Sequence, residues 1–231
     1  IHERLVGSEM CIRDRSAVNR RLHEMQIPRD PSLAAELFDA IVAASGSYGC
    51  EIWSTPHLVD WEAITKCPLQ RYQASVYKQT LGLKQGGTAT LPVFFELGRY
   101  PMQLQWLSRT VGYWNKLVAP QSTCTLLYEI LCANLHFGLG PEQATDRVAC
   151  WSSELCKALE FVDSSHDWRR HMLDRHLIDR THIMQCARQS FCQAMQQFTQ
   201  VDASAAEREG RVHRMYAQWM LLPGEHAELP Q

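Results

Sequence analysis

The chain has 231 residues, of which 45% are hydrophobic and 21% charged, and its formal net charge is −2. This length is sufficient to bury the core of one globular domain or of two small ones. The near-neutral net charge does not indicate any class of binding partner. The chain has no run of about eighteen apolar residues, so we expect no membrane-spanning helix.

Helical periodicity dominates the first half of the chain. Asp30 is placed to cap a helix with Pro31 at its first position, and one apolar stripe follows. The stripe comprises Leu33, Leu37, Phe38, Ile41 and Val42. A second helical pattern covers residues 57–82, where Pro68 should kink or split the helix and Gly82 should end it.

Two further helices are predicted between residues 90 and 118. Thr90 is placed to cap a short helix that Gly98 ends, and Pro101 starts a longer one. The apolar side of the longer helix comprises Leu104, Leu107, Val111, Trp114 and Val118. Its charged residues, Arg109 and Lys116, project to other sides.

The second half of the chain also has a helical pattern. One helix is predicted to begin near residue 122 and to be ended by the glycines Gly138 and Gly140. Three more are predicted over residues 141–162, 168–200 and 203–222. Linkers are expected around residues 119–123 and 201–205. Neither a convincing strand nor an internal repeat is present, so we expect a mainly α fold, an irregular multi-helix bundle without a substantial sheet.

Charge is distributed unevenly along the chain. Residues 30–65 contain six acidic residues and neither Lys nor Arg, whereas residues 66–118 carry seven basic residues against Glu96 alone, a balance of +6. Such asymmetry is typical of a face that binds a polyanion. The alternative is that the two segments pack together and partly neutralise each other.

The nine cysteines form no CxxC pair, and an odd number argues against a disulfide framework. We therefore expect reduced thiols in an intracellular protein. Two Cys/His pairs have helical i,i+4 spacing, Cys132 with His136 and His182 with Cys186, and would offer zinc four ligands if their helices met. Because neither pair has the short knuckle of structural zinc sites, we predict no metal site.

A weaker pattern is the dipeptide His166–Asp167, with His136 upstream. Helical metal-dependent phosphohydrolases of the HD type hold metal ions with a set of this kind. We favour the other interpretation, in which Asp167 caps a helix that begins near Trp168. Neither a phosphate-cradling loop nor a pair of adjacent acidic residues occurs in the chain. We therefore assign no catalytic residue.

Three blocks in order resemble the region after the catalytic palm in reverse transcriptases of non-LTR, LINE-type retrotransposons. The blocks are "RRLHEMQIPRDPSLAAELFDAIVAASGSYGCEIW", "CPLQRYQASVYKQTLGL" and "FFELGRYPMQLQWLSRTVGYWNKLV", and the similarity covers about residues 20–118. The residues that match the family pattern are Leu37, Phe38, Asp39, Tyr48, Gly49, Cys50, Glu51, Trp53, Leu81, Gly82, Glu96, Leu97, Gly98, Arg99, Pro101, Tyr113 and Trp114. A later "GRVHRMYAQWM" is loosely similar to another family block.

The resemblance implies a non-catalytic part of an RNA-directed DNA polymerase polyprotein, present in the cytoplasm and nucleus. The palm aspartates and their Mg²⁺ would lie upstream, with no cofactor in this part. The family's thumb helices guide an RNA–DNA or DNA template–primer duplex, and the remaining polyprotein is the other expected partner. We predict phosphate contacts from Arg71, Lys78, Lys84, Arg99, Arg109 and Lys116, and contacts to sugars or bases from Tyr72, Tyr77 and Tyr100, although tyrosines at helical spacing are more often core residues.

The N-terminal stretch "LVGSEMCIRDR", residues 5–15, is similar to the translation of a transposase-based sequencing adapter. We therefore expect residues 1–15 to be an artefactual leader, residues 16–118 a thumb-like helical region and residues 119–231 a truncated helical C-terminal region. A free-standing α-helical protein-interaction domain is the alternative function, and an HD-type phosphohydrolase is a weaker one.

Overall fold

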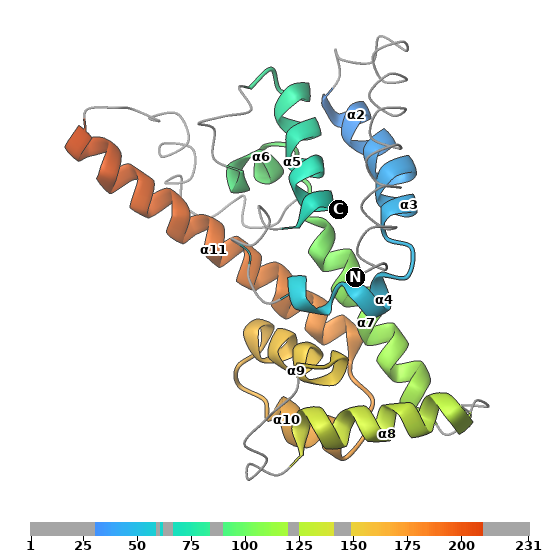
Figure 1. Ribbon diagram of the computed structural model, residues 1–231. Helices are drawn as coiled ribbons and strands as arrows, with labels where there is room; N and C mark the ends of the chain where they lie inside the picture. Colours follow the sequence, from blue (N-terminus) through green and yellow to red (C-terminus); the bar gives the residue numbers. More distant parts are fainter. Residues whose placement is uncertain are drawn as a thin grey trace.

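A computed structural model of the chain describes residues 31–58, 61, 67–83, 90–119, 125–140 and 149–209. All regular structure in these ranges is helical, and they contain no strand, which confirms the predicted mainly α fold (Figure 1). Within them, no helix is both long and apolar enough to cross a membrane. Asp30, the predicted first cap, lies outside these ranges.

The first helical run consists of α2 (Pro31–Leu37), the π-helical segment η1 (Phe38–Ala43) and α3 (Ala44–Gly46). Phe38 and Val42 are buried, but Leu33 and Ile41 are 45% and 50% exposed. The predicted apolar stripe was therefore wrong at these two positions. The physical reason is that Leu33 and Ile41 belong to a neighbouring i,i+4 row, whereas the row that begins at Ala34 faces the core.

The short helices α4 (Cys50–Trp53) and η2 (Thr55–His57) precede α5 (Pro68–Thr80) and α6 (Leu91–Glu96). Pro68 is the first residue of α5, so a helix starts at this proline. Of the predicted helical pattern before Pro68, the described residues Leu58, Trp61 and Cys67 are not helical, and residues 59–60 and 62–66 lie outside the described ranges. Gly82 and Gly98 follow the ends of α5 and α6 with φ angles of 69° and 61°. Glycine adopts this left-handed conformation without the steric cost of a side chain, which explains both helix ends.

The longest helix of the middle region is α7 (Met102–Val118), which begins directly after Pro101. Leu104, Leu107, Val111 and Trp114 are buried on its apolar side, as predicted, and Val118 is partly buried. Trp106 is also fully buried, whereas Arg109 and Lys116 are exposed. The buried side of α7 contacts α4, α8 and α11. Helix α7 therefore packs against elements from both halves of the described chain.

The C-terminal half contains α8 (Thr125–Leu139), α9 (Trp151–Val162), α10 (Trp168–Leu173) and α11 (Arg180–Glu209). The predicted continuous helix over residues 168–200 and the predicted linker at 201–205 were both wrong. Arg175 interrupts the helix with a φ of 56°, and the Asp179 carboxylate accepts the first N–H groups of α11. The pattern of apolar residues alone did not reveal this break, because helical spacing resumes on both sides of it.

Figure 1 shows α2, α5 and α6 at one end of the molecule and α8, α9 and α10 at the other. Helix α7 runs between the two ends, and α11 crosses it. The crossing is fixed by polar contacts as well as by apolar packing. Trp114 Nε1 donates to the His176 carbonyl at 2.9 Å, and the Asn115 side chain bonds both backbone groups of Ile178.

Candidate nucleic-acid interface

The six cations predicted to contact phosphates lie on different parts of the fold. Arg71 and Lys78 belong to α5, Arg99 follows α6, and Arg109 and Lys116 belong to α7. Lys84 lies outside the described residues. The structure therefore does not gather the whole predicted set on one helix.

Lys78 is buried, with 7% of its surface exposed, and its Nζ donates to Thr90 Oγ1 at 3.2 Å. Burial lowers the pKa of this lysine below its ordinary value because the charged form loses hydration. Thr90 occupies the predicted cap position of α6, but its side chain makes no cap hydrogen bond to the helix. The hydrogen bond from Lys78 to Thr90 joins α5 to the start of α6.

Arg99 binds two carboxylates of the acidic segment. Its Nη1 lies 3.3 Å from Asp39 Oδ2, and its Nη2 lies 3.4 Å from Glu36 Oε1. Burial raises the pKa of Asp39, and the Arg99 charge opposes that rise. At this point the acidic and basic segments pack together and neutralise each other, which is the alternative that the charge pattern left open.

The outer side of α7 carries two of the predicted cations. Arg109 and Lys116 are both exposed, and a spacing of seven residues places them on one side of the helix, about 10 Å apart along its axis. Arg109 Nη1 donates to the Ser47 carbonyl at 3.2 Å. Within the described ranges, neither side chain forms an ion pair with an acidic residue.

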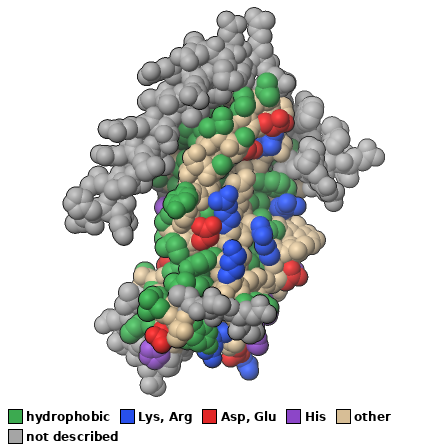
Figure 2. Space-filling model, turned by 90° about the vertical axis from the view of Figure 1, so that its right-hand side faces the viewer, with side chains coloured by type: hydrophobic (Ala, Val, Ile, Leu, Met, Phe, Trp, Pro, Cys, Tyr) green, Lys and Arg blue, Asp and Glu red, His purple; other side chains and the backbone are tan. Residues whose placement is uncertain are grey.

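A third cation beside this side of α7 is one that sequence reasoning missed. Arg180, the first residue of α11, donates from Nε to Ser108 Oγ at 2.7 Å, and Ser108 directly precedes Arg109. We call Arg109, Lys116 and Arg180 the α7 basic face. Figure 2 shows Lys and Arg side chains gathered near the middle of the side of the molecule that includes α7.

No local signal in the sequence assigns Arg180 to this face. It lies 72 positions from Ser108 along the chain, and only the crossing of α7 and α11 brings them together. Arg71 remains exposed near the start of α5 and likewise forms no ion pair with a described acidic residue. It lies on a different helix from the α7 basic face.

The three tyrosines considered for base or sugar contacts pack within the protein. Tyr72 and Tyr77 are 8% and 0% exposed and form ring contacts with Phe38. The Tyr100 ring packs against Phe191, and the Arg188 guanidinium lies over it. The structure therefore favours the core interpretation of these tyrosines over stacking on a nucleic acid.

The two Cys/His pairs contact different neighbours. The Cys132 sulfur lies 3.8 Å from Arg175 Nη1, whereas the His182 ring lies 3.2 Å from Asp163. The predicted set for a phosphohydrolase is likewise not gathered in the described residues, where no contact joins His136 to His166 or Asp167. Asp167 caps α10 by accepting from the Arg170 N–H at 3.0 Å, as predicted.

Comparison of the chain with protein-family models, with curated proteins and with solved structures found no match. The function is therefore inferred from the residues of this chain and from the geometry described above. Of the features described above, the α7 basic face is the one that bears on function.

Proposed function

We propose that this chain is a non-catalytic helical part of a LINE-type reverse transcriptase and that it binds a template–primer duplex through the α7 basic face. The observation that carries the proposal is that Arg109 and Lys116 share one side of α7 and that Arg180 of α11 hydrogen-bonds Ser108, the residue before Arg109. All three cations are exposed, and none forms an ion pair with an acidic residue of the described chain. The ordered motifs that resemble the reverse-transcriptase family support the same function.

The proposed contact is made with phosphate groups. A guanidinium binds phosphate oxygens in a planar, two-pronged geometry, whereas an ammonium acts as a point charge. The spacing of Arg109 and Lys116 lets them reach different phosphates of one strand, because successive phosphates rise by about 3.4 Å along a duplex. Contacts of this kind hold a duplex in position without reading its sequence.

In this proposal the chain positions the duplex and does not carry out the polymerase reaction. The family resemblance places the polymerase aspartates and Mg²⁺ in a palm that would belong to the same polyprotein. That polyprotein, in the cytoplasm and nucleus, is the proposed partner besides the duplex. Of the originally predicted cations, Arg109 and Lys116 carry the proposal, and Arg180 joins them.

Removal of charge from the α7 basic face tests the proposal. Affinity for a fluorescent RNA–DNA hybrid would be measured by anisotropy for the full chain and for an R109Q/K116Q double variant. The matched control is K157Q/R170Q, which removes the same charge from exposed residues of α9 and α10 that pair with Glu154 and Asp174. Comparing the two variants separates a local contact from the effect of net charge.

The expected result is that R109Q/K116Q weakens binding equally for hybrids of different sequence and lowers the salt slope by about 2, one for each lost phosphate contact. The control variant should retain the wild-type affinity and slope. Equal losses in the two variants would show that the α7 basic face has no special part in binding.

A protein-interaction function is the second candidate, and one feature of α8 favours it. Leu126, Ile130 and Phe137 are 64%, 51% and 64% exposed, and their spacing places them on one side of the helix. The opposite side of α8 buries Leu131 and Leu135. An exposed apolar stripe on a helix is typical of a surface that packs against a partner helix.

Sedimentation velocity distinguishes this second function from the first. If α8 mediates association, the chain forms a dimer or larger species as its concentration rises, and F137S removes that species whereas R109Q/K116Q does not. Association together with an absence of hybrid binding would favour the interaction function. Hybrid binding by a monomer would favour the nucleic-acid function.

A further inference from the structure

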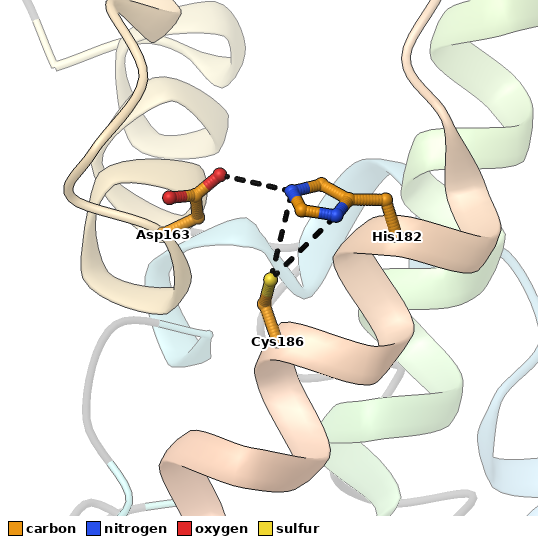
Figure 3. A group of neighbouring side chains, drawn as sticks. All are labelled: Asp163, His182 and Cys186. Atoms are coloured by element: carbon orange, nitrogen blue, oxygen red, sulfur yellow. Dashed lines mark hydrogen bonds and ion pairs between the residues drawn. The ribbon is translucent and has the colours of Figure 1, made fainter.

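Three side chains with metal-binding atoms meet where the end of α9 approaches the start of α11. They are Asp163, which directly follows α9, and His182 and Cys186 in the first turns of α11 (Figure 3). One potential ligand atom of each lies within 4.8 Å of the other two. The cluster shares no residue with the α7 basic face, although Arg180 lies two positions before His182 on α11, and it has no part in the function proposed above.

The distances in this cluster suit a single tetrahedral ion. His182 Nε2 lies 3.2 Å from Asp163 Oδ2 and 3.6 Å from Cys186 Sγ. Zinc bonds of about 2.0 Å to nitrogen or oxygen and about 2.3 Å to sulfur, at tetrahedral angles, place neighbouring ligand atoms about 3.3–3.6 Å apart. The two separations from His182 therefore match those that one zinc ion requires, and the Asp163 and Cys186 ligand atoms lie within 4.8 Å of each other.

The local fold holds these ligands for identifiable reasons. His182 and Cys186 are four residues apart on α11, so they share a face of the helix. The second oxygen of Asp163 accepts hydrogen bonds from the Ser165 backbone N–H at 3.1 Å and the Ser165 hydroxyl at 2.6 Å. An outer contact of this kind orients a carboxylate ligand and leaves its other oxygen directed at the ion.

We propose that Asp163, His182 and Cys186 bind one Zn²⁺ ion, with the fourth position open to solvent. A thiolate, an imidazole and a carboxylate together match the ligand preferences of zinc better than those of Mg²⁺ or Ca²⁺, which bind oxygen ligands. The Cys186 thiol loses its proton to solvent when the ion binds, and His182 presents a neutral Nε2. The bound ion fastens the end of α9 to α11.

The proposal can be tested by titration of the chelator-treated full chain with Co²⁺, which reports thiolate ligation by a sulfur-to-cobalt charge-transfer absorption band. We expect one ion per chain, displaced by Zn²⁺. The variant C186S should lose the charge-transfer band, and D163N should weaken zinc binding by about tenfold or more. Circular dichroism would verify that each variant is helical.

The matched control is C132S/H136Q, which removes the other i,i+4 Cys/His pair, on α8, and should leave the spectrum unchanged. X-ray absorption of the zinc-loaded wild-type chain tests the site without any substitution, so a folding defect in a variant cannot affect the result. A first coordination shell with one sulfur and nitrogen or oxygen neighbours supports the site. A shell without sulfur, a band that persists in C186S, or a band lost in C132S/H136Q would overturn it.

Discussion

The Arg99 guanidinium lies 3.3 Å from the Asp39 carboxylate, although 60 residues separate the two along the chain. The Tyr77 hydroxyl donates to the other oxygen of Asp39 at 3.3 Å. This contact joins the acidic part of the sequence to its basic part inside the fold. It explains why some of the excess positive charge in residues 66–118 stabilises the structure and only the remainder is available to a partner.

Replacement of Arg99 by Gln is expected to reduce stability without affecting nucleic-acid binding. Both side chains of the pair are little more than a quarter exposed, so the loss in free energy of unfolding should be about 1 kcal/mol. Urea unfolding of R99Q, D39N and the double variant measures the coupling. The interpretation fails if the two single losses are fully additive, or if R99Q weakens hybrid binding as much as R109Q/K116Q.

Much of the helical architecture was predictable because it depends on local chemistry. Gly82, Gly98 and Pro68 mark helix ends that follow from backbone conformation alone. The break between α10 and α11 was missed because it depends on one left-handed residue, Arg175, a conformation that its residue type does not suggest. The burial of Lys78 was also missed, since a lysine in a helical pattern is ordinarily exposed.

Ser47 provides a second prediction about stability. Its hydroxyl accepts a hydrogen bond from Trp106 Nε1 at 2.9 Å, and both residues are completely buried. The variant S47A leaves the indole N–H without this acceptor and should lower the free energy of unfolding by about 1–2 kcal/mol. The control S45A alters an exposed serine that bonds the Ile41 carbonyl and should change stability by less than about 0.5 kcal/mol. Equal effects of the two variants would contradict the assignment.

Tyr77 should make the protein sensitive to alkaline pH. Burial and the nearby Asp39 charge raise the pKa of Tyr77 above its ordinary value of 10.0. Because the pKa is higher in the folded state, this contribution to stability is present below about pH 10 and is lost as the pH rises toward the folded-state pKa. The variant Y77F should be about 1 kcal/mol less stable near pH 8 but should lose less stability between about pH 8 and pH 11. Parallel losses in Y77F and wild type, measured by urea unfolding, would refute this role.

The cysteines should differ in reactivity toward an alkylating reagent. Burial raises the pKa of Cys150, but hydrogen bonds from Ser152 and Ser153 outweigh it and lower the pKa below its ordinary value. Burial and Glu160 raise the pKa of Cys156 to about 12. Mass spectrometry of a timed iodoacetamide reaction near neutral pH should therefore show Cys150 modified before Cys156. The variant S153A should slow the reaction at Cys150, and equal rates at the two thiols would disprove the prediction.

The candidate sites were less predictable than the fold because they combine distant residues. The sequence identified Arg109 and Lys116 as exposed cations, but Arg180 joins them only through the crossing of α7 and α11. Likewise, the spacing of His182 and Cys186 was visible, whereas their third neighbour, Asp163, belongs to the end of another helix. Local periodicity gives the face of a helix on which a residue lies, but it does not give the element that packs beside that face.

The central claim is that this chain binds a template–primer duplex through phosphate contacts. The most direct measurement is the affinity of the wild-type chain for an RNA–DNA hybrid as a function of salt concentration. We predict binding whose logarithm falls linearly with the logarithm of salt concentration, with a slope of about −2 to −3 for the three cations of the α7 basic face. Absence of binding at low salt, or an affinity that does not change with salt, would contradict the claim.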